Sequence, residues 1–250
     1  MALAERTALG WRCVAVAPSY DTFIALAHGI PVDWNAASIP GSAPSVTKLL
    51  EATAHLTRAH LSVVAIDMPV AMVPITGRRV ADNAISKAFG GRGCSTHSPN
   101  KKRPGDLGAV LSSEFQSRGY TIATASDPTG TLDRLIEVYP HPALLSLLGR
   151  DKRAPYKVSK AGAYWPDLPA SKRRRSILHE FETIRDRLQN ELCHLELPLP
   201  PLETVTTLRM LKRYEDALDA LICVWVGTLY IEKKALAFGD STAAIWCPTD

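Results

Sequence analysis

The sequence predicts an α/β fold in which a mixed β-sheet carries helices on its faces. Short apolar, β-branched runs alternate along the chain with longer segments of helical periodicity, which favours layers of sheet and helix. Near the N-terminus, two apolar runs separated by Pro18–Asp21 predict a β-hairpin ahead of that alternation. The length of 250 residues suits one large domain, and we expect a single domain over residues 1–250.

Hydrophobic spacing places the elements of the N-terminal half. Leu61–Ile66 is an uninterrupted apolar run, which is typical of a strand buried on both faces. Residues 71–108 are rich in Gly, Pro and basic residues, and we expect a loop-rich insertion there. The other expected elements are hairpin strands at Arg12–Ala17 and Thr22–Ala27, a loop over 29–45, and helices at Val46–Ala59 (capped by Ser45), Val80–Phe89 and Leu107–Arg118.

The C-terminal half continues the alternation. A charged segment over 171–194 has an apolar stripe at helical spacing, which predicts a long amphipathic helix. Leu197–Pro201 alternates Leu and Pro and indicates a stiff linker. The remaining expectations are strands at Tyr120–Thr124 and Leu135–Val138, a helix at Ala143–Leu148, irregular structure over 150–170, a mostly apolar helix at Tyr214–Leu236, and an edge segment at Ala244–Pro248.

Composition excludes several classes of protein. No apolar run approaches the roughly 20 residues that span a bilayer, and the N-terminal apolar run is too short for a signal peptide, so we expect a cytoplasmic protein without a membrane partner. The five cysteines are scattered and never spaced as CxxC, which disfavours disulfides and structural zinc. The net charge of +4 gathers in Arg78–Arg79, Lys101–Arg103 and Lys172–Arg175, runs that suit either phosphate contacts or solvated helix faces.

Carboxylates in apolar surroundings are the candidate catalytic groups. Asp67 ends an apolar strand, Glu137 ends another, and Asp219 lies in an apolar helix with Asp216 three residues earlier on the same face. Converging carboxylates repel one another unless a cation holds them ionised, and oxygen ligands favour Mg²⁺ or Mn²⁺. The alternatives are a turn-capping role for Asp67, a surface position for Asp216, and structural ion pairs for Glu137 and Asp219.

An ordered set of motifs over nearly the whole chain resembles a family of unknown function described as predicted RNase H-like nucleases. The motifs are Val64–Pro69, Gly77–Asp82, Arg92–His97, Arg103–Gly105, Ile136–Pro142, Tyr156–Lys157, Asp216–Leu221, Gly239–Asp240 and Ile245–Pro248. The resemblance implies an RNase H-like, five-stranded mixed sheet flanked by helices, with metal-binding carboxylates on the first strand, a central strand and the last helix. It assigns Asp67 to the central strand, Asp219 with Asp216 to the last helix, and Glu137 to a position facing both.

One position departs from that pattern. The resemblance implies an Asp at the end of the first strand, but the chain has Val14–Pro18 there, with Asp21 as the nearest carboxylate. A missing first carboxylate weakens the second of two metal sites. Among the other polar residues, Arg78, Arg79 and Lys157 are expected to bind substrate phosphate, and Asp82 is expected to be a further substrate-binding residue. His141 is expected to act as a general acid or base, with a hydrogen-bonded structural histidine as the alternative.

These observations favour a metal-dependent nuclease that hydrolyses phosphodiester bonds of nucleic acid, its partner, with Mg²⁺ or Mn²⁺ bound by Asp67, Glu137, Asp216 and Asp219. Two alternatives stay open. A non-catalytic nucleic-acid-binding module on the same fold accounts for the lost first-strand Asp. The other is a hydrolase of a small nucleotide or phosphorylated substrate, which the Gly-rich segment Gly90–Gly93 does not support by itself, since it lacks the P-loop and Rossmann spacings.

Overall fold

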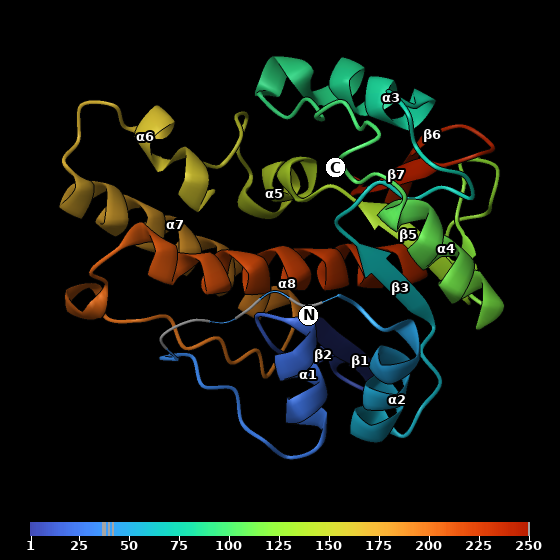
Figure 1. Cartoon of the computed structure of the whole chain (residues 1–250), viewed down its shortest axis with the longest axis horizontal. Helices are drawn as coiled ribbons and strands as arrows, with labels where there is room; N and C mark the ends of the chain where they lie inside the picture. Colours follow the sequence, from blue (N-terminus) through green and yellow to red (C-terminus); the bar gives the residue numbers. More distant parts are fainter. Residues whose placement is uncertain (37–38, 40, 42, 250) are drawn as a thin grey trace. The chain divides into compact units, whose positions relative to one another are not determined.

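The computed structural model describes residues 1–36, 39, 41 and 43–249, and Figure 1 shows its helices and strands. The chain divides into two compact units. Unit 1 comprises Met1–Ala59 and Ala154–Leu221, and unit 2 comprises His60–Arg153 and Ile222–Asp250. The long helix α8 (Lys212–Ile231) contributes its first half to unit 1 and its second half to unit 2. The single domain expected over 1–250 stays a prediction.

Unit 2 is built on a five-stranded mixed sheet. Its strands are β3 (Val63–Ile66), β4 (Thr121–Ile122), β5 (Arg134–Val138), β6 (Ala235–Gly239) and β7 (Ala244–Pro248). They follow the order β3-β5-β7-β6, and β4 also pairs with β5. Strands β3, β4 and β7 run parallel to β5, whereas β6 runs antiparallel to β7. Helices α3 (Val80–Phe89), α4 (Leu107–Ser117) and α5 (Pro140–Leu148) and the 3₁₀ helix η1 (Gly90–Arg92) complete the unit.

Unit 1 joins an N-terminal hairpin to helices. The hairpin pairs β1 (Ala2–Thr7) with β2 (Gly10–Val16) in antiparallel register. The apolar stripe expected on the charged helix is confirmed, because Ile177, Phe181, Ile184 and Leu188 are fully buried. The helices of the unit are α1 (Tyr20–Ala27), α2 (Val46–Thr57), α6 (Ala161–Tyr164) and α7 (Ala170–Glu191), with 3₁₀ helices η2 (Val158–Lys160), η3 (Leu202–Thr204) and η4 (Leu208–Leu211).

The predicted α/β class, the five-stranded mixed sheet flanked by helices and the N-terminal hairpin are confirmed, an arrangement consistent with an RNase H-like fold. One strand of the expected hairpin is wrong, since residues 22–27 belong to α1. Ser19 and Thr22 form a capping box at the start of that helix, so Pro18–Asp21 begins a helix rather than a turn. The partner of β2 is instead β1, a strand with polar residues among its apolar ones.

Three expectations in the C-terminal half are also wrong. The segment 244–248 is not at an edge, because β7 lies between β5 and β6 and all of its residues are buried. Helix α8 ends at Ile231, and residues 235–239 form β6 instead of extending the helix. Helix α5 starts at Pro140 rather than Ala143, since proline suits the first helical turn, where its missing N–H is not needed.

The loop expected over 29–45 includes residues 37, 38, 40 and 42, which lie outside the described residues.

Candidate functional site

Three acidic side chains meet on one face of α8, within unit 1. Glu215, Asp216 and Asp219 each offer a carboxylate oxygen, and these oxygens all lie within 4.8 Å of one another. Asp219 lies four residues after Glu215 and three after Asp216, which places it on the same helix face as both. Glu215 and Asp219 are buried, whereas Asp216 is half-exposed. We call these three residues the α8 cluster, and hard oxygen donors of this kind can hold a metal ion.

Residues 156–158, which lead into η2, hold two members of the α8 cluster in place. The hydroxyl of Tyr156 donates to Asp219 Oδ1 at 2.6 Å, and Lys157 Nζ donates to Asp219 Oδ2 at 2.5 Å. The backbone N–H of Val158 donates to Glu215 Oε2 at 2.6 Å. Burial raises the pKa of Asp219, although the ammonium of Lys157 and the hydroxyl of Tyr156 act to lower it. The segment therefore orients the carboxylates and offsets part of their desolvation.

Two lysines share the negative charge of the α8 cluster. Lys157 Nζ also lies 3.7 Å from Glu215 Oε1. Lys212 Nζ lies 2.8 Å from Glu215 Oε1 and 2.6 Å from Asp216 Oδ1. Three carboxylates and two ammonium groups leave a formal charge of about −1. The side chain of Lys212 is 52% exposed, so this ammonium can leave the cluster with little loss of packing and make room for a divalent cation.

A cavity of about 400 Å³ lies beside the α8 cluster, also within unit 1. It is lined by Asp216 and by three basic residues, Arg209, Lys212 and Arg213. The guanidinium of Arg209 makes no hydrogen bond or ion pair with the part of the chain that the structure describes. Pro18, two residues after the end of β2 and near the position where the first-strand Asp was expected, lines the same cavity as Asp216. Asp21 lies on the first turn of α1 and is exposed.

A second charged cluster lies in unit 2, around Arg79. Its guanidinium donates to both oxygens of Glu137 at 2.6 Å each, to both oxygens of Asp82 at 3.0 and 3.1 Å, and to Val70 O at 3.0 Å. These bonds use all five N–H donors of an arginine. Glu137 is 3% exposed and also accepts the N–H of Val70 at 3.0 Å. Burial raises the pKa of Glu137, although Arg79 and the N–H of Val70 act to lower it.

The Arg79 cluster (Arg79, Glu137 and Asp82) ties the loop after β3 and the start of α3 to strand β5. The ion pair considered as the alternative role of Glu137 is present. Asp82 is 1% exposed and accepts the backbone N–H of Arg79 at 2.9 Å, which caps α3. Because every donor of Arg79 is used inside the protein, its expected contact with phosphate needs one of these bonds to break.

The other residues singled out in the sequence have different environments. Asp67 is exposed, directly after Ile66, the residue whose Cα pairs with Glu137. His141 is buried in the first turn of α5, with its ring edge-to-face against Tyr139 at 5.2 Å. Arg78 is exposed and donates to neutral acceptors, among them Asn83 Oδ1 at 2.8 Å. Asp67 and Glu137 belong to unit 2 and Asp219 to unit 1, so their expected convergence stays a prediction.

Sequence reasoning missed Glu215, Lys212 and the pairing of Tyr156 with Asp219. The signal for Glu215 and Lys212 was available, because Lys212, Glu215, Asp216 and Asp219 follow the i, i+3, i+4, i+7 spacing of one helix face. No local signal links Tyr156 to a residue 63 positions later.

The fold and the α8 cluster define an α/β protein with a candidate acidic metal centre. Residues 7–242 match the family described as "Protein of unknown function (DUF429)", and the chain belongs to this family. The expected membership in a family of unknown function is thereby confirmed. No curated protein and no solved structure matches the chain. Among the described residues, no helix has the length and apolar character needed to cross a membrane.

Proposed function

We propose that the protein is a metal-dependent nuclease that hydrolyses phosphodiester bonds of nucleic acid at the α8 cluster, with Mg²⁺ or Mn²⁺ held by Glu215, Asp216 and Asp219. The observation that carries the proposal is the approach of three carboxylate oxygens to within 4.8 Å. An all-oxygen donor set suits these two ions rather than zinc. When bound, such an ion supplies an activated water and neutralises charge on the phosphoryl oxygens.

The chain's own residues support this chemistry. Lys157 and Tyr156 fix the rotamer of Asp219 through two short hydrogen bonds. The neighbouring cavity offers the guanidinium groups of Arg209 and Arg213 to the phosphates that flank the scissile bond. The acidic cluster alone would repel a polyanion, so cations beside it are required for substrate to approach.

The missing first-strand carboxylate predicts a weak second metal site. Pro18 lines the cavity next to Asp216 and has no side-chain carboxylate to offer. Substitution Pro18→Asp places a carboxylate at that position. We expect Pro18→Asp to raise cleavage at low Mn²⁺ concentration, because it adds an oxygen ligand beside the α8 cluster. Unchanged cleavage across the Mn²⁺ range would contradict this part of the proposal.

The direct test is cleavage of labelled single- and double-stranded DNA and RNA, with Mg²⁺, Mn²⁺ or EDTA. We expect cleavage that needs a divalent ion and falls about 100-fold in Asp219→Asn, which corresponds to the loss of about 2.7 kcal/mol of transition-state stabilisation from one metal-binding carboxylate. The matched control is Asp186→Asn on α7, whose side chain is 60% exposed and, within the described part of the chain, pairs with its neighbour Arg185 alone. The proposal is wrong if no ion supports cleavage, or if Asp219→Asn keeps full activity.

A second candidate is a non-catalytic nucleic-acid-binding module. The observation that favours it is that Lys157 and Lys212 already neutralise most of the α8 cluster without a metal ion. The basic run at residues 172–175 in the first turns of α7 provides a further cationic surface. This candidate predicts binding to nucleic acid that weakens steeply with salt, without turnover in Mg²⁺ or Mn²⁺. Turnover would exclude it, and so would a lack of salt-sensitive binding.

A further inference from the structure

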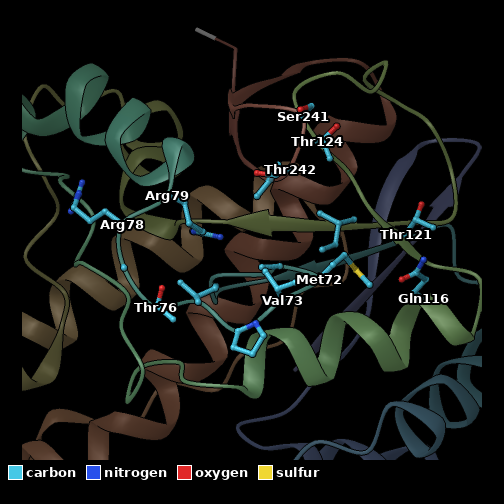
Figure 2. Close-up of a pocket in the computed structure, with 16 residues that line it drawn as sticks. Met72, Val73, Thr76, Arg78, Arg79, Gln116, Thr121, Thr124, Ser241 and Thr242 are labelled. Carbon is cyan, nitrogen blue, oxygen red and sulfur yellow. The ribbon is translucent and has the colours of Figure 1, made fainter.

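Unit 2 contains a cavity of about 720 Å³ that neither the α8 cluster nor the Arg79 cluster explains. It is lined by the loop at residues 71–79, by Gln116 of α4, by residues 121, 122 and 124 in and after β4, and by the β6–β7 turn (Figure 2). Met72 is 50% exposed and Val73 is 67% exposed on this loop. The volume lies within the range of small-molecule sites, and a ligand would cover apolar side chains that are otherwise in water.

The charged groups of this cavity have no donor left for an anion. Arg78 and Arg79 are the only charged residues among the described residues that line it. All five N–H groups of Arg79 donate to Glu137, Asp82 and Val70 O. The one guanidinium and two carboxylates of the Arg79 cluster together have a formal charge of about −1. In Figure 2 the side chain of Arg78 extends toward α3, and all three nitrogens of its guanidinium donate to neutral acceptors, among them Ser86 Oγ at 2.8 Å. A phosphate or carboxylate in the cavity would therefore be desolvated without a partner.

Uncharged hydrogen-bonding groups line the same cavity. The side chains of Thr76, Gln116 and Ser241 make no hydrogen bond with the residues that the structure describes. The hydroxyls of Thr124 and Thr242 are engaged with Asp127 and Asp240 and keep acceptor capacity. Figure 2 shows Thr124, Ser241 and Thr242 gathered in one part of the view, with Gln116 and Thr121 at another. The lining thus combines an apolar wall with separate amide and hydroxyl groups.

We propose that this cavity binds an uncharged heterocyclic compound of nucleoside size. Its ring faces would contact Met72, Val73 and Ile122, and its polar edges would bond to the amide of Gln116 and the hydroxyls of Thr76 and Ser241. The ligand is neutral because the lining offers amide and hydroxyl groups but no free cation. This site lies within unit 2 and does not depend on hydrolysis at the α8 cluster.

The test is equilibrium binding in EDTA, which excludes any contribution from a metal-loaded α8 cluster. Adenosine and uridine are compared with their 5′-monophosphates and with glucose, by calorimetry and saturation-transfer NMR. We expect the nucleosides to bind and each monophosphate to bind about tenfold more weakly, because its phosphate gains no cation. Overturning results are the absence of nucleoside binding at millimolar concentration, equal or tighter binding of the monophosphates, and glucose binding in preference to the nucleosides.

Variants place the binding in the cavity. Val73→Arg puts a charge on the apolar wall and is expected to weaken nucleoside binding about tenfold. The control Leu132→Arg alters an apolar residue of unit 2 that is 51% exposed and does not line the cavity, and it should leave binding unchanged. Gln116→Ala, a change of an exposed side chain, should weaken binding about fivefold through one lost hydrogen bond. If Val73→Arg and Gln116→Ala both bind like the parent protein, the nucleoside binds elsewhere and the proposal is wrong.

Discussion

Replacement of Arg79 by alanine is expected to destabilise unit 2 by about 3–5 kcal/mol, because it leaves two buried carboxylates without their cation. Glu137 is 3% exposed and Asp82 is 1% exposed, so neither side chain can turn to water in the folded state. The substitution also removes the four side-chain hydrogen bonds that Arg79 makes to these two carboxylates and the one it makes to Val70 O. A loss at the upper end of the range is expected because both carboxylates lose their partner at once.

Urea unfolding followed by circular dichroism measures this loss, with Arg78→Ala as the control. Arg78 is exposed and bonded only to neutral acceptors among the described residues, so its removal costs hydrogen bonds but leaves no buried charge unpaired, and we expect a smaller loss of about 1–2 kcal/mol. Adding Glu137→Gln to Arg79→Ala should recover about 1–2 kcal/mol, since it neutralises one of the orphaned carboxylates. Equal costs for Arg78→Ala and Arg79→Ala would refute the structural role of Arg79. So would an Arg79→Ala protein of parental stability that has lost affinity for nucleic acid.

Three further changes test other parts of the structure. Gly108→Ala places a Cβ 2.3 Å from the carbonyl oxygen of Pro69, so a thermal melt should show a loss of about 1–3 kcal/mol, and an unchanged melt would contradict that close packing. Burial acts to raise the pKa of Asp127, but hydrogen bonds from Thr124 and the charge of Arg134 lower this pKa below its ordinary value of 3.8. The ionised carboxylate of Asp127 therefore stabilises the fold above pH 3.8, and this stabilisation is lost as pH falls through the lowered pKa. Urea unfolding at about pH 6 and about pH 3 should therefore show a smaller loss for Asp127→Asn than for the parent, and equal losses would count against this assignment. Lys212→Ala removes an ammonium that competes for the α8 cluster and should tighten Mn²⁺ binding about tenfold in calorimetry, whereas weaker binding would show that Lys212 supports the ion.

Elements with a strong local signal could be predicted from the sequence. Helix α3 spans the expected residues 80–89, because its apolar spacing covers them and a Gly-rich run follows, in which η1 ends at Gly93 in the left-handed conformation. Strand β5 was found as an apolar run that stops at prolines. Strand β1 could not be predicted in this way, because polar residues interrupt its apolar ones. Its backbone forms a strand by pairing with β2, and that pairing has no signal in the local sequence. Helix α1 was predicted as a strand because of its β-branched residues. The capping box between Ser19 and Thr22 favours a helix start at this point instead.

The candidate site was predicted only in part, because only some of its residues have a local signal in the sequence. Asp216 and Asp219 were identified from helical spacing, and the structure adds Glu215 by the same rule. The environment of Glu137 was not predictable, because its partner Arg79 lies 58 residues earlier and reaches it only when the loop after β3 folds back. The charge of a buried residue can be recognised in a sequence, but the residue that neutralises it depends on tertiary structure.

The most direct test of the central claim is a Mn²⁺ titration followed by electron paramagnetic resonance, comparing the parent protein with Asp219→Asn and Asp186→Asn. We expect a saturable Mn²⁺ site tighter than about 1 mM in the parent and in Asp186→Asn, and its loss in Asp219→Asn, measured at a temperature at which circular dichroism shows this variant to be folded. Mn²⁺ binding of parental strength in Asp219→Asn, or no saturable site in the parent protein, would contradict the assignment of a metal ion to the α8 cluster.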